Sequence, residues 1–427
     1  MTKALTPIIG ITVLIQVLIF LIGLTNNVIL SRWLGPEVLG ALAIIIVLIE
    51  ILYKTVNPGL DTATLFFISN KRFPFSKLIG NYLFNGLLIF VISILLLAVI
   101  SETKIISVLF ETINADLVAE NFGGMVLYLF TYQFYEFGIK IPLGLQQFKR
   151  YNKIQILKPV ILFIFLIICS MVLQVQLWLV LVVISFSFMI PTILLWRNAF
   201  PIKIQWNKEI TSQSVSYGYK VMVGNLLTFL TYRSDIILIG LFLSQTAVGW
   251  YYVSVLIAEK LLLLTQATGT IFFPAASSSG EHRQKTPILT RTNLFFVLIG
   301  SVIIGSAAPW IVPLLFSTDY SNSVMPVIVL LPGIAALTVS KILSADFGAR
   351  GLPKYSMYIS FLNFFLNIIL NLILIPKIGI VGAALSSSIS YTAGTILQFY
   401  FYKKITGIQL REIILIHRDD LKSLRKI

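Results

Sequence analysis

Four ionisable side chains occur in two stretches of sequence that are otherwise strongly apolar. Arg233 and Asp235 lie in one stretch, and Glu259 and Lys260 lie in the next. An ionisable group inside a membrane-spanning helix is costly unless it faces a wet cavity or pairs with an opposite charge. Adjacent helices can bring the four groups together. They then form either a cavity wall that holds an anionic group or a buried network of structural ion pairs.

Other apolar stretches also carry paired charges. Glu50 with Lys54, and Glu136 with Lys140, place an acid four residues before a lysine, which is the favourable order on one helix face. Lys54 and Lys140 stand toward a helix end, where long side chains also snorkel to the interface. The embedded cations are Arg233, Lys260, Lys341, Lys54 and Lys140, and the embedded carboxylates are Asp235, Glu259, Glu50, Glu136 and Asp346. Balanced charges suit an anionic ligand that competes with internal carboxylates, or coupling of a proton or monovalent cation to a carboxylate.

The composition identifies the surroundings of these groups. The chain has 427 residues, of which 57% are hydrophobic and 11% charged, and its mean hydropathy is +0.93. Soluble domains carry about 25% charged residues, so lipid must be the main solvent of this chain. The lone cysteine, Cys169, and the two separated histidines, His282 and His417, predict neither a disulfide nor a metal site.

Apolar stretches of about 20 residues are long enough to cross a bilayer as helices. We expect twelve spans, at residues 7–30, 37–57, 77–100, 121–145, 154–173, 177–196, 214–243, 247–272, 292–315, 324–346, 354–375 and 380–402. The first is interpreted as a retained helix, because it is longer than the apolar part of a signal peptide. Continuous apolar runs exclude the alternating pattern of a barrel. The short loops between them leave no room for a soluble catalytic domain.

The distribution of lysine and arginine orients these spans. With the N-terminus inside, every inside loop is basic, for example at residues 71–77, 149–153 and 197–208, and the tail after residue 402 is basic as well. The first large outside loop carries Glu102, Glu111, Asp116 and Glu120 instead. This alternation obeys the positive-inside rule and requires an even number of spans, with both termini cytoplasmic. The net charge of +15 therefore needs no nucleic-acid partner.

A constant shift relates the two halves of the chain. Sliding the sequence by about 209 residues places Leu34 on Leu243, Gly40 on Gly249 and Glu50 on Glu259. Six spans per half preserve orientation, so the halves are predicted to be parallel repeats, 1–205 and 206–427. Two such lobes can rock about a central site and expose it to each side of the membrane in turn.

Two polar or aromatic patterns have open interpretations. Tyr128, Tyr132 and Tyr135 with neighbouring phenylalanines suit either sugar stacking or an interfacial aromatic belt. Asn363, Asn367 and Asn371 form a stripe at four-residue spacing, followed by small residues from 382 to 388. Small residues permit close helix approach, which favours packing over ligand contact for this stripe. We find no phosphate-binding loop and no Ser/His/Asp arrangement, so no cofactor is expected.

Several stretches resemble the polysaccharide-transport, or O-antigen flippase, branch of the multidrug/oligosaccharidyl-lipid/polysaccharide flippase superfamily. They are Leu30–Gly40 (LSRWLGPEVLG), Leu143–Phe148 (LGLQQF), Arg233–Asp235 (RSD), Val248–Tyr251 (VGWY), Phe273–Pro274, Gly351–Lys354 (GLPK) and Asn371–Ala384 (NLILIPKIGIVGAA). The motifs cover essentially the whole chain, in order.

The resemblance implies a V-shaped, two-lobed, all-α bundle in a bacterial inner membrane. Such a protein would flip a polyprenyl-diphosphate-linked oligosaccharide from the cytoplasmic to the outer leaflet. The implied diphosphate ligands are Arg233, Lys260 and Lys341. Asn26 and Asn27 stand where the second repeat has Asp235, which departs from a symmetrical charged site. Implied partners are the lipid-linked oligosaccharide, membrane lipids, a monovalent cation or proton, a polysaccharide polymerase and glycosyltransferases.

Two other functions are compatible with parts of this pattern. A cation- or proton-coupled multidrug exporter of the same superfamily would use Asp235 and Glu259 as coupling groups. A membrane polysaccharide polymerase would need a sizeable outer loop, and the short outside loops argue against it. We therefore expect a transporter and not an enzyme.

Overall fold

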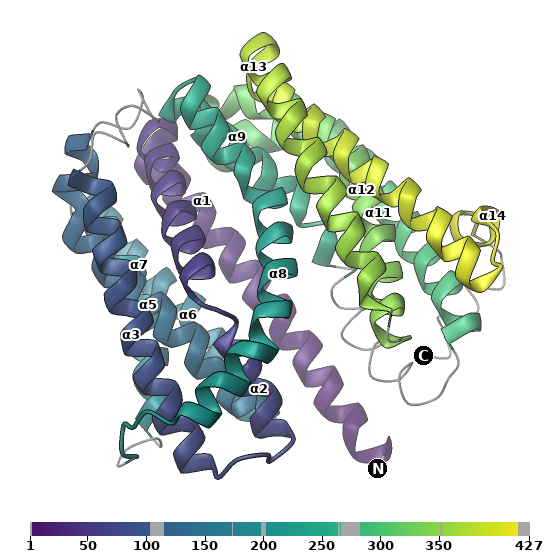
Figure 1. Cartoon of the computed structure of the whole chain (residues 1–427). Coiled ribbons are helices and arrows are strands. Elements are labelled where there is room, and N and C mark those ends of the chain that lie inside the picture. Colours follow the sequence, from purple (N-terminus) through teal and green to yellow (C-terminus); the bar gives the residue numbers. More distant parts are fainter. Residues whose placement is uncertain are drawn as a thin grey trace. The chain divides into compact units, whose positions relative to one another are not determined.

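The computed structural model describes residues 2–102, 115–172, 174–197, 202–263, 265, 282–350 and 352–416 (Figure 1). Within these ranges the chain forms helices, turns and connecting segments, and no strand. This agrees with the prediction of an all-helical membrane protein. The predicted features at His417, Phe273–Pro274, Gly351 and Glu111, and parts of the span 247–272 and of the C-terminal tail, lie outside the described residues.

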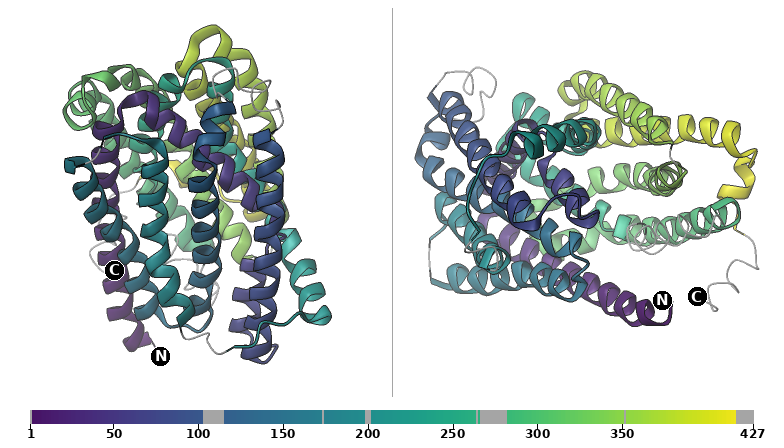
Figure 2. Two further views of the ribbon diagram at one scale, coloured as in Figure 1. Left: turned by 90° about the vertical axis from the view of Figure 1, so that its left-hand side faces the viewer. Right: turned by 60° about the horizontal axis from the view of Figure 1, so that its bottom comes forward.

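The chain divides into two compact units, Met1–Leu226 and Leu227–Ile427. Unit 1 contains α1 (Thr2–Val56), α2 (Leu60–Ser69), α3 (Phe75–Glu102), α5 (Ala115–Gly144), α6 (Phe148–Val172), α7 (Leu177–Trp196) and the first part of α8 (Lys208–Phe242). In this unit α5 packs against α7, α3 and α2, while α6 packs against α1 and α7. Figure 2 shows these helices side by side as one bundle.

Unit 2 contains the rest of α8, α9 (Gln245–Glu259), α11 (His282–Phe316), the 3-10 helix η2 (Thr318–Ser323), α12 (Val324–Ala349), α13 (Pro353–Thr406) and α14 (Leu410–Ile414). Its centre is α12, which packs against α13, α11 and α9. Gly333 of α12 lies so close to Ser388 of α13 that a Cβ on Gly333 would stand 2.5 Å from the Ser388 Cα. The predicted lobe boundary at residue 205 stays a prediction.

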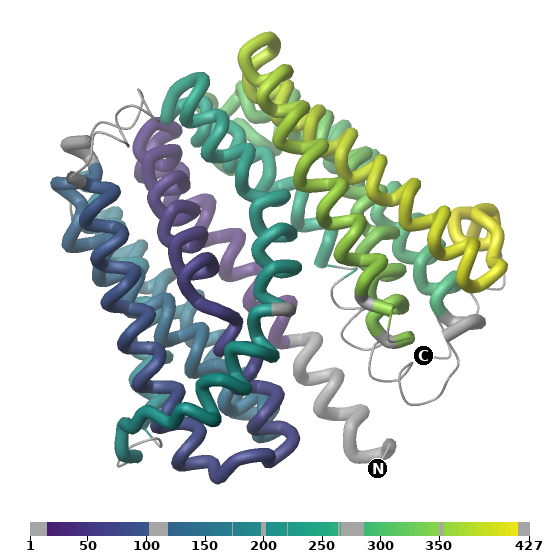
Figure 3. Tube along the Cα trace, viewed as in Figure 1, coloured from purple at the N-terminus to yellow at the C-terminus, as the bar shows by residue number. Residues whose placement is uncertain are grey.

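Two very long helices are each broken at a glycine with positive φ. In α1 the break is at Gly35 (φ 69°), and in α13 it is at Gly379 (φ 64°). Glycine adopts this conformation at little cost because it has no Cβ. In Figures 1 and 3 both helices reverse direction, and the two halves of α13 lie side by side. Each therefore contains two of the predicted spans.

Eight helices of the described part are long and apolar enough to cross a membrane, α1 and α13 among them. The chain is a multi-pass membrane protein. Helices α5 and α9 are not among the eight: α5 mixes tyrosine, glutamine and glutamate with its apolar residues, and α9 has 15 residues. Twelve spans in two parallel repeats remain a prediction.

The surface of the helices is apolar and part of their interior is polar. On α3, the side chains of Leu88, Leu95 and Val99 are about half exposed, as lipid contact requires. Two turns before Leu88, on the same face of α3, Asn81 is buried, and its Oδ1 accepts hydrogen bonds from the Asn207 backbone N (2.7 Å) and the Thr211 hydroxyl (3.0 Å). These bonds fix the segment that leads into α8.

Two glycines meet backbone to backbone inside unit 1. A Cβ built on Gly59, which follows α1, would lie 2.3 Å from the carbonyl oxygen of Gly218 in α8. Gly59 also has a positive φ of 76°. Beside this crossing, the rings of Phe66 and Tyr217 stack with centroids 4.3 Å apart. The crossing is therefore closed to any side chain.

Gly59→Ala is expected to lower the stability of the protein by about 1–3 kcal/mol, the usual cost of forcing extra atoms into a packed contact. The measurement is the thermal unfolding temperature of the detergent-solubilised protein. Gly123→Ala is the matched control, because a Cβ at Gly123 has no atom within 4 Å. Equal unfolding temperatures for the two variants would contradict the close approach.

Candidate functional site

A tight connection brings the charged segments of α8 and α9 together. The α9 N-cap, Ser244, accepts a hydrogen bond from the Ala247 backbone N at 3.1 Å. Such caps satisfy backbone donors that the first helical turn leaves free. Since α9 starts immediately after α8 ends, the helices run back along each other. At 1.5 Å per residue, Arg233 lies about 15 Å and Glu259 about 22 Å from the turn. The offset of about 7 Å along the helices is short enough for the arginine side chain to bridge.

Arg233 and Glu259 form a two-pronged ion pair. The Arg233 Nη1 atom lies 3.1 Å from Glu259 Oε1, and Nη2 lies 3.3 Å from Oε2. Paired bonds of this kind are stronger and more directional than a simple charge contact. The two side chains are 30% and 31% exposed. The pair is therefore held in place yet reachable from outside the protein interior.

Two lysines of unit 2 lie within electrostatic range of the same carboxylate. The electrostatic neighbours of Lys260 are Glu259 and Arg233, and that of Lys341 is Glu259. The Lys341 ammonium also lies 5.3 Å from the ring centroid of Tyr232, within cation–π range. All three cations are half-buried. We call Arg233, Glu259, Lys260 and Lys341 the cation cluster.

The cation cluster has three positive charges and one negative charge. A net excess of two, partly shielded from water, suits a ligand group that carries about two negative charges. Arginine binds phosphate oxygens with a planar fork, and lysine binds them as a point charge. By its charge, the cluster suits a phosphate or diphosphate group better than a neutral or cationic one. The structure thus places three of the predicted cations together.

Asp235 lies beside this cluster but in a different environment. Its side chain is 2% exposed, and it accepts hydrogen bonds from the Tyr251 hydroxyl and, at 2.9 Å, from the Ile236 backbone N. The Ser387 hydroxyl of α13 lies 3.5 Å from its Oδ2 atom. A buried carboxylate among neutral partners is an unusual and costly arrangement, so it is a candidate for binding a proton or a small cation.

The asparagine stripe of α13 extends this network. Asn367 accepts from Ser234 at 3.3 Å and from Asn371 at 2.9 Å, and it donates to Ser387 at 3.2 Å. The side-chain oxygen of Asn371 is buried and accepts no hydrogen bond from the described residues. Oxygen atoms of Asp, Asn and Ser are typical ligands for hard cations. Hydrogen bonds between packed helices thus accompany this stripe, for which the sequence favoured packing.

Four more of the predicted residues lie in unit 1. Lys140 and Glu136 on α5 are 3.9 Å apart, a loose pair with side chains 25% and 30% exposed. Glu50 and Lys54 at the end of the second half of α1 are half-buried. Lys54, Lys140, Glu50 and Glu136 are therefore all partly accessible, and they belong to a unit separate from the cation cluster.

Sequence inspection missed Lys158, a cation of unit 1. Its ammonium lies 3.7 Å from the ring centroid of Phe188 and 5.7 Å from that of Tyr135. Its electrostatic neighbours are Glu136 and Glu50. The predicted span 154–173 places Lys158 near its start, next to a basic loop. A lysine at that position is explained by the positive-inside rule alone. The helix α6 in fact begins at Phe148, so Lys158 is about 15 Å into it at 1.5 Å per residue.

Asp346 has a structural environment. It is fully buried, accepts a hydrogen bond from Thr286 at 2.9 Å, and pairs with Arg350 at 2.5 Å one turn later. A paired and hydrogen-bonded buried carboxylate stabilises the helix contact between α11 and α12. No cluster of three or more His, Cys, Asp or Glu side chains that could hold a metal ion occurs in the described residues.

Comparison with known proteins places this chain in a family. A family model described as "Polysaccharide biosynthesis protein" matches residues 29–325. The probable low-salt glycan biosynthesis flippase Agl15 of Haloferax volcanii is 25% identical over 183 residues, which cover 42% of this chain and 39% of that protein. The chain thus spans about two fifths of the length of this relative.

Solved structures show the fold. The Lipid II flippase MurJ in its inward closed conformation matches with a TM-score of 0.79 over 92% of this chain and 87% of that one, at 13% identity. An inward-facing multidrug resistance MATE family transporter of the MOP superfamily matches with a TM-score of 0.74 over 91% of this chain and 94% of that one, at 15% identity. At this identity the matches show a shared fold.

Proposed function

This chain belongs to the polysaccharide biosynthesis protein family, and from that membership we propose that it is a flippase for a polyprenyl-diphosphate-linked oligosaccharide. The direction proposed is from the cytoplasmic to the outer leaflet of a bacterial inner membrane, by alternating access of two lobes. One observation carries the proposal: three cations gather around one partly exposed carboxylate in unit 2. This excess positive charge suits the diphosphate that links lipid to sugar.

In this proposal the cation cluster holds the diphosphate. Arg233 exchanges Glu259 for phosphate oxygens, while Lys260 and Lys341 add charge around the same position. Glu259 holds Arg233 in place when no substrate is bound. It also competes with the diphosphate for Arg233, which favours release of the substrate. The cations Lys54 and Lys140 with Glu50 and Glu136 are proposed to contact the substrate in the N-terminal lobe. The chain acts as a transporter and not as a catalyst.

We further propose that Asp235 couples transport to a monovalent cation or a proton. The support is its burial among Tyr251, Ser387 and the asparagine stripe, which together offer oxygen ligands. A cation or proton at Asp235 offsets the cost of a carboxylate buried among neutral hydrogen-bond donors. Because Asp235 is two residues from Arg233, a cation or proton bound at Asp235 changes the electrostatic potential at the cation cluster, and so changes its affinity for the diphosphate.

The first experiment is removal of the protein from cells of its source organism. We expect lipid-linked repeat units to accumulate facing the cytoplasm and surface glycan to be lost, while added protein restores both. Leaflet location is measured by the access of an added glycosidase or lectin to sealed membrane vesicles of known orientation. Repeat units that reach the outer face unpolymerised would instead support a polymerase, and surface glycan that persists unchanged would contradict the flippase.

The second candidate function is drug export, favoured by the MATE-like fold and by the embedded carboxylates. For a flippase, cells that lack the protein keep their sensitivity to cationic drugs. For an exporter, sensitivity rises, and Glu259→Gln fails to restore resistance because the carboxylate that would bind a cationic drug is gone. Measuring minimal inhibitory concentrations in the two strains separates these functions.

A further inference from the structure

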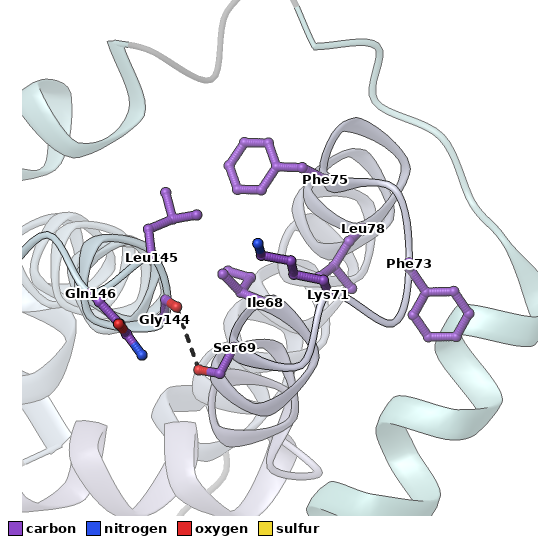
Figure 4. Close-up of a pocket in the computed structure, with 9 residues that line it drawn as sticks. All are labelled: Ile68, Ser69, Lys71, Phe73, Phe75, Leu78, Gly144, Leu145 and Gln146. Carbon is purple, nitrogen blue, oxygen red and sulfur yellow. Dashed lines mark hydrogen bonds between the residues drawn. The ribbon is translucent and has the colours of Figure 1, made fainter.

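A cavity lies in unit 1, where α2 and α5 end. Its volume is about 600 Å³, and it is lined by Ile68, Ser69, Lys71, Phe73, Phe75, Leu78, Gly144, Leu145 and Gln146. These residues come from the end of α2, the start of α3 and the end of α5 (Figure 4). The volume is sufficient for a polar headgroup with the first part of a hydrocarbon chain. We call it the α2–α5 cavity.

The two helices that border the cavity end in the same way. After α2, the Lys71 N donates to Ile68 O (3.2 Å) and the Arg72 N donates to Phe67 O (3.3 Å). After α5, the Gln146 N donates to Leu143 O (3.1 Å) and the Gln147 N donates to Pro142 O (2.8 Å). These paired bonds are Schellman motifs, which close a helix with one residue in the left-handed conformation.

Glycine usually occupies the left-handed position of this motif, but here Lys71 (φ 50°) and Gln146 (φ 57°) do. A side chain at such a position is strained relative to glycine, and backbone strain in proteins tends to collect at binding sites. Both strained residues line the same cavity. The chain thus has two polar side chains at positions where glycine would cost less backbone strain, and both line the α2–α5 cavity.

Close packing forms the back of the cavity. A Cβ on Gly144 would lie 2.9 Å from the Cβ of Ile68, and the Ser69 hydroxyl lies 3.5 Å from the Gly144 carbonyl oxygen. The ends of α2 and α5 are therefore fixed against each other. In Figure 4 the Lys71 ammonium points into the space between Phe75, Ile68 and Leu145.

The lining has one cationic end and an apolar wall. Lys71 is the one charged residue among the nine that line the cavity, and Gln146 adds amide donors. Phe75 and Leu145, each 40% exposed, offer apolar surface beside Lys71. Helix carboxyl ends disfavour anions, but their last carbonyls are bonded in the Schellman motifs and Lys71 supplies a full positive charge. A ligand that matches carries one negative charge beside hydrocarbon.

We propose that the α2–α5 cavity binds the phosphate of an anionic membrane phospholipid, held by Lys71 and Gln146, with the lipid's glycerol and chains against Phe75 and Leu145. The basic residues near it were predicted to lie on the cytoplasmic side, where anionic lipids attract cations. None of the residues proposed to contact the flipped substrate lines this cavity, so the proposal stands or fails independently of that function.

The test measures thermal unfolding of the detergent-solubilised full chain. Phosphatidylglycerol should raise the unfolding temperature of the wild type by about 2–4 °C, as a ligand that binds the folded state does. Phosphatidylcholine, which has the same chains and no net charge, should give a clearly smaller shift. Inorganic phosphate at the same concentration should give none, and an equal shift with phosphate would overturn the lipid assignment.

Lys71→Gly is the decisive variant, because it removes the cation and gives the left-handed position its preferred residue. It should unfold at or above the wild-type temperature without lipid, yet lose the shift with phosphatidylglycerol. Gln146→Gly should lose part of it. Lys77→Ala, which removes an exposed lysine of the first turn of α3, should keep the shift. A full shift in Lys71→Gly would show that Lys71 merely ends α2 and would overturn the proposal.

Discussion

Arg233→Ala is expected to abolish surface glycan while the protein still reaches the membrane. The arginine makes two hydrogen bonds to Glu259 in the structure and is proposed to make equivalent bonds to the diphosphate. A hydrogen bond to a charged group contributes about 1.5–3 kcal/mol. Losing about 2 kcal/mol of substrate binding corresponds to roughly a 30-fold drop in affinity, since 1.4 kcal/mol is a factor of ten.

The double variant Arg233→Ala/Glu259→Gln separates substrate binding from structural pairing. If Arg233 serves only to neutralise Glu259, removing both charges should restore transport. If Arg233 holds the diphosphate, the double variant should remain inactive. Arg233→Lys should be intermediate, because it keeps the charge and loses the two-pronged geometry.

The control for these variants is Arg291→Ala, which removes an arginine that bonds to the Glu412 backbone oxygen at 2.8 Å in another part of unit 2. It should retain surface glycan. The readouts are surface glycan and the amount of protein in isolated membranes. Normal glycan in Arg233→Ala cells would remove Arg233 from the proposed site.

Asp235→Asn is expected to stop transport and to abolish stabilisation by the coupling ion. The substitution keeps the size of the side chain and its place beside Tyr251 and Ser387, so the fold should persist. A cation present at 100 times its dissociation constant stabilises the folded state by about 2.7 kcal/mol. The unfolding temperature of the wild type should therefore rise with one monovalent cation, at constant ionic strength, or with falling pH.

Asp346→Asn is the matched control, because Asp346 is also buried but is paired with Arg350. It should lower the unfolding temperature and keep the response to the ion. A wild-type response that survives unchanged in Asp235→Asn would place the coupling ion elsewhere. A response to pH and to no metal cation would identify the proton.

The sequence predicted the helices well because lipid imposes a strong rule: backbone polar groups must be satisfied within each span. Hydropathy marks the part of a helix that contacts lipid, and it is blind to the helical turns beyond it. For this reason the predicted span starts at residue 154, whereas α6 begins at Phe148. The same difference hid the position of Lys158 well inside the helix. In α1 the chain reverses at Gly35, and Pro36 directly after it opens the second helical half.

The charged residues of the candidate site could be predicted from the sequence. Arg233 and Glu259 are rare residue types in apolar helices, and consecutive helices with a short connection must be neighbours. Tyr251 and Ser387 were not identified as partners of Asp235, because neutral polar residues occur in many membrane helices for packing alone. Their role depends on which face of α9 and of α13 turns toward α8, and one sequence does not specify those rotations.

The breaks at Gly35 and Gly379 have a consequence for how the chain enters the membrane. Each joins two long helices directly, with Arg32 and Glu37 beside the first break and Lys377 beside the second. The second helix of each pair therefore follows the first directly during synthesis, and the two are expected to insert together as one hairpin. An epitope tag or glycosylation acceptor placed at either break has no loop to occupy and should block insertion of the pair. A long polar insertion should be tolerated better between α7 and α8, where a connecting segment already exists.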